Sequence, residues 1–142
     1  EPAAGLTRLV LCLLLDAYTT QTYKDSDGKD KERTFLKLHP KLAPFKVAVL
    51  PLVKKDPMLT CAKTITRDLR SLGLNVICDH SASIGKRYAK HDEIGTPWCV
   101  TVDSQTEVDK KVTVRMRDTT EQIRLPVDQV VSWVTEQLTK AS

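Results

Sequence analysis

The amino-acid sequence predicts an α/β fold, in which about three helices pack on a mixed sheet of about five strands. Three patterns support this prediction. The unbroken apolar run Lys46–Leu52 is typical of a strand covered on both faces. The segment that follows has the apolar spacing of an amphipathic helix. Farther along, strict alternation in Lys111–Arg117 indicates a strand with two different faces.

The first helix of the domain is predicted directly after the strand Lys46–Leu52. Its apolar residues fall at spacings of three and four, and they are Leu59, Ala62, Ile65, Leu69 and Leu72. Gly73 follows this stripe, where a left-handed C-cap is favoured. The next segment, Leu74–Asp79, is predicted to be a second strand.

A short, charged helix is predicted after Ser83. Either Ser81 or Ser83 can act as its N-cap, because a serine side chain can bond the free backbone N–H groups of a first turn. Gly95 and Pro97 end the helix, and Trp98–Asp103 follows as a third strand. This helix therefore connects two buried strands.

The strand Lys111–Arg117 is predicted to have one wet, basic face. Its basic face carries Lys111, Thr113, Arg115 and Arg117, and its apolar face carries Val112, Val114 and Met116. Turn residues between Asp103 and Lys110 predict an antiparallel hairpin with the preceding strand. The last helix is predicted after Pro126, with a stripe of Val127, Val130, Val131, Val134 and Leu138.

Length and charge set limits on the class of protein. The chain has 142 residues, of which 41% are hydrophobic, enough for one compact domain with its own core. Its formal net charge is +4, which is compatible with a nucleic-acid partner without requiring one.

The cysteines and histidines predict no metal site. The four cysteines are Cys12, Cys61, Cys78 and Cys99. They show no CxxC spacing, which favours buried free thiols in a reducing compartment.

The apolar run Leu9–Leu15 is far shorter than the roughly 20 residues that cross a bilayer. We therefore expect a soluble, cytoplasmic protein.

The beginning of the sequence differs in character from the rest. From Leu9 to Ala17 it predicts a helix that is apolar around nearly its whole circumference, which needs burial on all sides. We therefore expect residues 1–18 to end a larger N-terminal domain. Residues 19–33 are polar and carry the turn signal DSDGKD, which indicates a linker or an exposed hairpin. The main domain is then expected over 34–142.

The charged helix after Ser83 has a basic side that could bind phosphates. Its cationic side chains are Lys86, Arg87, Lys90 and His91, which form two pairs four residues apart. Arg115 and Arg117 could extend this basic strip, because phosphates need several cations on a rigid surface. The alternative is a solvated helix face, partly paired with Asp92 and Glu93.

The sequence gives little support for catalysis within the domain itself. Asp79, His80 and Ser81 are consecutive in one loop, whereas a catalytic triad converges from separate parts of the chain. Walker A and GxGxxG motifs are absent from the sequence. A self-contained enzyme is therefore not expected.

Several segments together resemble one family. These are FLKLHPKLAPFKVAVLPLVKKD, SIGKRYAKHDEIGTPWCVTVD and VTVRMRDTTEQIRLPVDQV. In this order they resemble the C-terminal anticodon-binding domain of glycyl-tRNA synthetases, the class II enzymes of the homodimeric, bacterial type. The resemblance covers nearly the whole chain and is weakest in residues 19–33.

The first residues, EPAAGLTRLVL, resemble motif 3 of class II synthetases. The resemblance implies that Arg8 contacts ATP and that Glu1 lies near the amino group of glycine. A planar guanidinium suits a triphosphate, and a carboxylate suits an ammonium. Thr7 and Ala3 depart from the acidic residue and the serine that are common in the family at these positions. Motifs 1 and 2 are absent from this chain. The chain alone is therefore not expected to activate glycine or to hold a cofactor. The resemblance implies that the full-length enzyme uses ATP with Mg²⁺.

The resemblance also implies recognition of glycine tRNA, in which the second and third anticodon bases are both cytidine. Carboxylate and arginine side chains can read the pairing edge of cytidine. The expected base contacts are Asp92, Glu93, Arg115 and Arg117, and the expected phosphate contacts are Lys86, Arg87 and Lys90.

Three functions follow as alternatives. In the first, the chain is part of a homodimeric glycine–tRNA ligase, whose full length forms glycyl-adenylate and transfers glycine to tRNA. In the second, it belongs to a non-catalytic nucleic-acid accessory protein of the same lineage, such as a mitochondrial DNA polymerase accessory subunit; an ATP arginine at Arg8 favours the ligase. In the third, it is a protein-interaction domain, and alanine at Arg115 and Arg117 would leave RNA binding unchanged.

Overall fold

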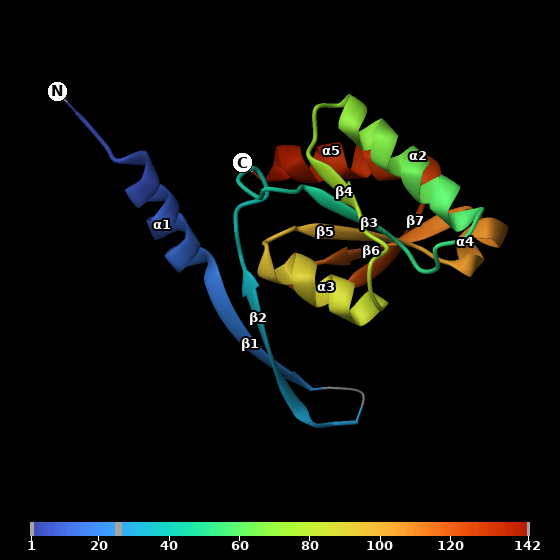
Figure 1. The fold of residues 1–142 in the computed structure, drawn as a ribbon, viewed down its shortest axis with the longest axis horizontal. Coiled ribbons are helices and arrows are strands. Elements are labelled where there is room, and N and C mark those ends of the chain that lie inside the picture. The colour runs from blue at the N-terminus through green and yellow to red at the C-terminus, as the bar shows by residue number, and fades with distance from the viewer. Residues whose placement is uncertain (1, 25–26, 142) are drawn as a thin grey trace.

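A computed structural model describes residues 2–24 and 27–141 of the chain. In this part of the chain, a five-stranded mixed sheet carries helices on both faces, and a separate two-stranded hairpin lies beside it (Figure 1). The large sheet consists of β3 (Val47–Pro51), β4 (Val76–Cys78), β5 (Trp98–Val102), β6 (Lys111–Met116) and β7 (Gln122–Pro126). The helices of the domain are α2 (Met58–Ser71), α3 (Ile84–Glu93), α4 (Ser104–Asp109) and α5 (Val130–Lys140), the last preceded by a 3-10 turn, η1 (Val127–Gln129).

The strand order confirms the predicted α/β class with a mixed sheet. The order is β4-β3-β5-β6-β7, with β3 parallel to β4 and β5, and with β6 antiparallel to both its neighbours. Parallel strands need a crossover connection, which α2 supplies between β3 and β4 and α3 supplies between β4 and β5.

Alternate residues of β3 are buried on opposite faces of the sheet. Val47 and Val49 belong to the main hydrophobic core, together with residues of α2 and α5. On this side, Trp98 and Trp133 meet edge to face, with ring centroids 5.8 Å apart. Ala48 and Leu50 point the other way and pack under α3. This double burial explains why the sequence of β3 is apolar throughout instead of alternating.

Two elements differ from the sequence-based prediction. The connection between β5 and β6 contains a helix, α4, where only a turn was expected. Asp103 caps it: its carboxylate accepts a hydrogen bond from the backbone N–H of Thr106 at 2.9 Å, and the Thr106 hydroxyl bonds back to the Asp103 backbone. The prediction also did not locate β7, which pairs with β6 and completes the sheet.

The described part of the segment 19–33 lies within an antiparallel hairpin made of β1 (Tyr18–Lys24) and β2 (Asp30–Leu36). The predicted DSDGKD turn falls partly outside the described residues, although Gly28 has the positive φ of 72° that such a turn requires. Strand β2 packs against α3. The hairpin therefore forms part of the surface around this helix.

Helix α1 (Leu6–Ala17) leads directly into β1 and projects from the domain (Figure 1). Its sequence predicted burial on all sides. Within the described residues, however, most of this helix is exposed. Its exposed apolar side chains are Leu6, Leu9, Val10, Leu11, Leu14 and Leu15, the first of them 75% exposed. Only Ala17, next to the hairpin, is buried among the residues of α1. The described residues thus offer this helix no apolar partner for most of its circumference.

Candidate nucleic-acid interface

Helix α3 is held against the sheet by its apolar side and by one buried arginine. Ser83 occupies the N-cap position, as the sequence allowed, although its side chain makes no capping hydrogen bond. Arg87 is 3% exposed. Its Nη1 donates to the carbonyl oxygens of Pro51 at 2.7 Å and Asp79 at 3.0 Å. Arg87 therefore fastens α3 to the carboxyl ends of β3 and β4.

His91 is also buried and faces Asp79. Its Nε2 lies 3.3 Å from Oδ2 of Asp79, and the side chain has no exposed surface. Lys90 donates to the same oxygen at 2.8 Å, while its own side chain stays 53% exposed. Burial opposes ionisation of Asp79, but hydrogen bonds from Lys90 and Ser81 outweigh it and hold the pKa of this carboxyl well below its usual range. Asp79 is thus an ionised anchor beneath α3.

A second buried carboxylate, Asp92, holds two arginines. Arg115 of β6 makes a two-pronged ion pair with it, through Nη1 at 2.9 Å and Nη2 at 3.0 Å. Arg33 of β2 donates Nη1 to Oδ2 of Asp92 at 3.2 Å. All three side chains are at most 11% exposed. Asp92 therefore joins α3, the large sheet and the hairpin at one point.

Arg117 links three separate segments through their backbone. Its Nη1 donates to the carbonyl of Gly95 at 2.7 Å, and its Nη2 donates to the carbonyl of Leu38 at 2.8 Å. Gly95 has a φ of 81°, and a Cβ there would lie 2.8 Å from a side-chain carbon of Leu38. The turn after α3 thus approaches the residue 38 segment closely, and Arg117, which is 2% exposed, ties the two together.

These contacts overturn the predicted wet, basic face of the strand Lys111–Arg117 at Arg115 and Arg117, which are buried, whereas Lys111 is exposed as predicted. Arg115 and Arg117 do share a face, as the alternation predicted, but α3 and the hairpin cover it. The predicted continuous basic strip on α3 is interrupted as well, because Arg87 and His91 point into the protein. Alternation separates the two faces of a strand but does not show whether water or another layer covers the polar one.

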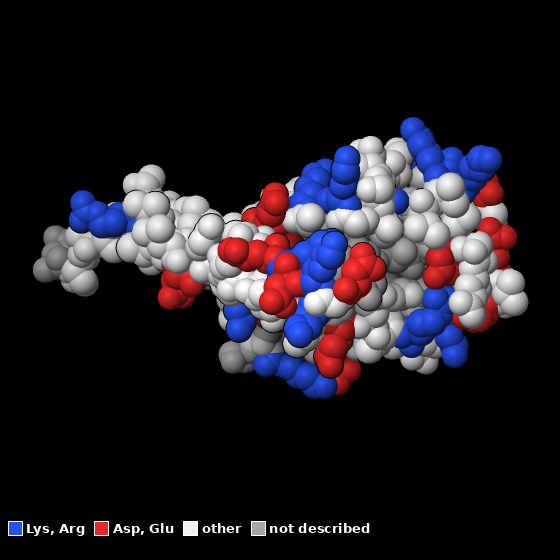
Figure 2. Space-filling model, turned by 90° about the horizontal axis from the view of Figure 1, so that it is seen from below, with Lys and Arg blue, Asp and Glu red and all other residues white. Residues whose placement is uncertain are grey.

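The charged side chains that stay exposed on α3 are Lys86, Lys90 and Glu93. Figure 2 shows the side of the molecule on which α3 and the hairpin lie, with lysine and arginine interspersed among aspartate and glutamate. The surface is therefore mixed in charge and not uniformly basic. Of the predicted tRNA contacts, Asp92, Arg87, Arg115 and Arg117 are buried.

A cleft of about 520 Å³ lies between the hairpin and α3, and we call it the hairpin cleft. Its lining includes Tyr23, Glu32 and Arg33 from the hairpin, Tyr88 and Glu93 from α3, and Arg115 from β6. The sequence did not single out the three hairpin residues, because a polar segment between two domains looks like a linker. Only the packing of β2 on α3 brings them to the site.

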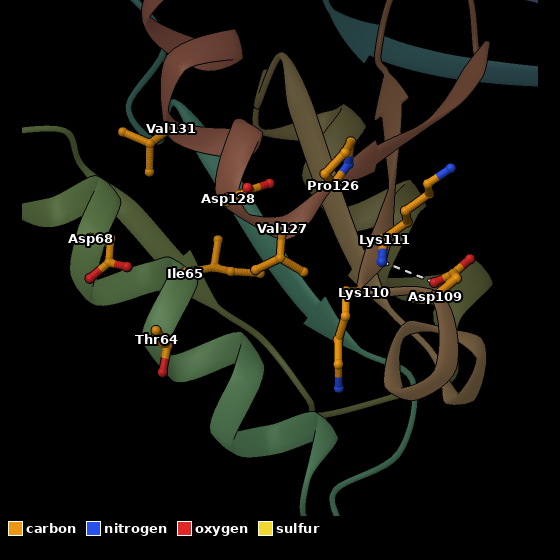
Figure 3. A pocket seen from close by; sticks show the side chains of 10 residues that line it. All are labelled: Thr64, Ile65, Asp68, Asp109, Lys110, Lys111, Pro126, Val127, Asp128 and Val131. Carbon is orange, nitrogen blue, oxygen red and sulfur yellow. Dashed lines mark hydrogen bonds between the residues drawn. The ribbon is translucent and has the colours of Figure 1, made fainter.

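The opposite side of the sheet carries another hollow, of about 430 Å³ (Figure 3). It lies between α2 and the β7–η1 connection, and its lining includes Ile65 and Val127, with Lys110 and Lys111 at one end. The backbone N–H of Lys111 donates to the Asp109 carboxylate at 2.9 Å (Figure 3). The lining of this hollow combines aliphatic and charged side chains and includes no aromatic one, so it gives no stacking platform for a base.

Three further observations concern catalysis, metals and membranes. Arg8 lies exposed in the first turns of α1, and Glu1 lies outside the described residues. Across residues 2–24 and 27–141, no three side chains of histidine, cysteine, aspartate or glutamate gather as a metal site would require. None of the helices in the described part combines the length and apolar character needed to cross a membrane.

The buried His91 predicts that the protein loses stability in mild acid. Burial lowers the pKa of His91 below its ordinary value of 6.5, although Asp79 acts in the opposite direction. Lys90 disfavours the charged imidazole and Asp92 favours it. Below pH 6.5 the unfolded chain therefore binds more protons at this residue than the folded chain, and stability falls.

Urea unfolding at pH 7.5 and pH 5.5 tests this expectation. We expect a lower free energy of unfolding at the lower pH, with a slope of at most about 1.4 kcal/mol per pH unit for one proton. His91→Gln should flatten that slope, whereas His80→Gln, at an exposed neighbour, should leave it unchanged. An equal slope in the wild type and in His91→Gln would contradict the assignment.

Comparison with known proteins identifies related sequences. The family described as "Anticodon binding domain" matches residues 46–137. The glycine–tRNA ligase of Bifidobacterium longum is 48% identical over 134 residues, that of Rhodopirellula baltica 47% over 142, and that of Pyrococcus furiosus 48% over 130. The alignments cover 94%, 100% and 92% of this chain, but only 27%, 26% and 22% of those three relatives.

Two solved structures of related fold also come from tRNA synthetases. The prolyl-tRNA synthetase of Cryptosporidium parvum, complexed with L-proline and AMP, superposes with a TM-score of 0.71 at 18% identity, covering 88% of this chain and 35% of that one. The RNA binding domain of a threonyl-tRNA synthetase from Cryptosporidium parvum Iowa II gives a TM-score of 0.63 at 31% identity, covering 70% of this chain and 25% of that one. The first likeness concerns the fold alone.

Proposed function

Because the chain belongs to the family of anticodon binding domains, we propose that it is the anticodon-binding part of a glycine–tRNA ligase. The observation that carries this proposal is the identity of 47–48% to ligases from distant organisms over nearly the entire chain. The relatives named here are ligases, which favours this function over an accessory protein or a protein-interaction domain.

We propose that RNA lies across the exposed side of α3. Lys86 and Lys90 are the cations still accessible there, and they suit phosphate groups. Glu93 is accessible for a hydrogen bond to a base. Arg115 and Asp92 neutralise each other beneath the surface, so their proposed role is to hold α3 and the hairpin in place. Arg87 and Arg117 have a similar supporting role through backbone carbonyls.

The activity of the whole protein is a further proposal, since this chain spans about a quarter of its relatives. The full-length enzyme would activate glycine with ATP and Mg²⁺ and charge glycine tRNA, as a homodimer in the cytoplasm. Residues 1–18 would end its catalytic domain, with Arg8 toward ATP and Glu1 toward the glycine amino group. The segment 19–33 would then connect it to the anticodon-binding domain, 34–142.

Fluorescence anisotropy with a glycine tRNA anticodon stem-loop tests the proposal. We expect affinity to fall with salt, because phosphate contacts release counterions. We expect a loop with both anticodon cytidines replaced to bind at least about tenfold more weakly, equivalent to roughly 1.4 kcal/mol. Equal binding of the two loops would contradict anticodon reading by this chain.

The variant Lys86→Ala tests whether Lys86 contacts an RNA phosphate directly or affects binding only through the net charge of the protein. It should weaken both loops alike and reduce the slope of log affinity against log salt by roughly 0.7–0.9. Lys63→Ala is the matched control, because Lys63 is an exposed lysine on α2, on the opposite face of the sheet. The same loss in both variants would show that Lys86 makes no specific contact.

A further inference from the structure

We propose that the hairpin cleft is a pocket for one unpaired nucleobase that offers an amino group, and that the β1–β2 hairpin is an active wall of this pocket. The inference rests on the proposed RNA-binding function. The proposal adds the β1–β2 hairpin as a binding element. This hairpin precedes residues 46–137, the region that the family model matches.

The charges of the cleft disfavour a phosphate as its occupant. Three carboxylates line it, from Glu32, Asp92 and Glu93, against the two guanidinium groups of Arg33 and Arg115. Both guanidinium groups already bind the Asp92 carboxylate, at 3.2 Å and 2.9 Å. The cleft therefore presents net negative charge to a ligand, which disfavours a phosphate.

Two of these carboxylates remain available for a ligand. Glu32 and Glu93 are exposed, and neither makes a hydrogen bond or ion pair with the described residues. They come from different elements, one from β2 and the other from the last turn of α3. Ionised carboxylates only accept hydrogen bonds, so they select a partner that donates.

The walls suit a flat partner. Tyr23 of the hairpin and Tyr88 of α3 both line the cleft. Tyr88 is fixed in place, because its hydroxyl group lies 2.6 Å from that of Thr101 and its ring lies 4.8 Å from the Arg115 guanidinium. The volume of about 520 Å³ falls in the usual range for small-ligand sites. Aromatic side chains provide a platform for unpaired bases whatever their sequence.

Cytosine meets these requirements better than uracil, whose pairing edge has only the ring N3–H as a donor. Cytosine carries an amino donor at N4, which a glutamate can accept, whereas uracil has a carbonyl oxygen at the same position. A carboxylate facing that oxygen would place two acceptors against each other. The cleft would thus discriminate between two pyrimidines of the same size.

Stem-loops that differ only by cytidine-to-uridine changes in the anticodon test the pocket. The wild type should prefer the cytidine loop by at least about tenfold. Alanine at both Glu32 and Glu93 should reduce this preference to less than about twofold, because the accepting groups are lost. Glu32→Ala alone should reduce the preference measurably, since the proposal makes the hairpin part of the pocket.

Glu136→Ala is the matched control. Glu136 is an exposed glutamate on α5, across the sheet from the cleft, so its loss changes the net charge equally and should leave the preference intact. A double variant that keeps the full cytidine preference overturns the pocket but leaves anticodon binding in place. A wild type that binds neither loop overturns both proposals.

Discussion

Replacing Asp92 by alanine is expected to lower the free energy of unfolding by about 3–5 kcal/mol, the usual cost of removing one partner from a buried ion pair. The substitution leaves Arg33 and Arg115 without their shared carboxylate, and both guanidinium groups are nearly buried. Since Arg33 is one of the hairpin's links to α3, amide exchange in β1 and β2 should also become faster. Urea unfolding and hydrogen exchange measure the two effects.

The control for this variant is Asp68→Ala. Asp68 also pairs with an arginine, Arg67, but on the surface, where the two side chains are 45% and 75% exposed. Such a pair contributes about 0–1 kcal/mol, so this variant should unfold nearly as the wild type does. If Asp92→Ala were no more destabilising than Asp68→Ala, the Asp92 contacts would not support the domain.

Arg117→Ala is expected to lower the free energy of unfolding by about 3 kcal/mol or more, because each hydrogen bond to a charged group contributes about 1.5–3 kcal/mol. The two carbonyls that it binds, those of Gly95 and Leu38, would lose their charged donor. Arg117→Lys keeps the charge but lacks the fork that reaches both carbonyls, so an intermediate loss is expected. Thermal and urea unfolding of the two variants measure these losses.

RNA binding distinguishes this supporting role from the base contact that the sequence suggested for Arg117. At a temperature where Arg117→Lys is fully folded, its affinity for the anticodon stem-loop should equal that of the wild type. Arg67→Ala serves as the control for loss of an exposed arginine, with little effect on unfolding. Normal stability combined with weak RNA binding in Arg117→Lys would instead favour a direct contact.

The local pattern of the sequence was sufficient for the class of fold and for most of its elements. The apolar run became β3, the stripe from Leu59 to Leu69 became part of α2, and Gly73 adopted a positive φ just after that helix. These features depend on hydrophobic periodicity and on the conformational freedom of glycine, which act within a few residues. The quoted motifs also sufficed for the family resemblance, which the family match confirms.

Tertiary structure alone decided which charged residues face water. Lys86 and Arg87 are neighbours in the sequence, yet one is exposed while the other binds three backbone carbonyls inside the protein. Likewise Arg115 sits on the polar face of its strand, but α3 and the hairpin cover that face and bring Asp92 and Arg33 to it. Arg33 is separated from Asp92 by 59 positions along the chain. Burial and ion pairing at such separations depend on how the layers pack, and no local pattern encodes that packing.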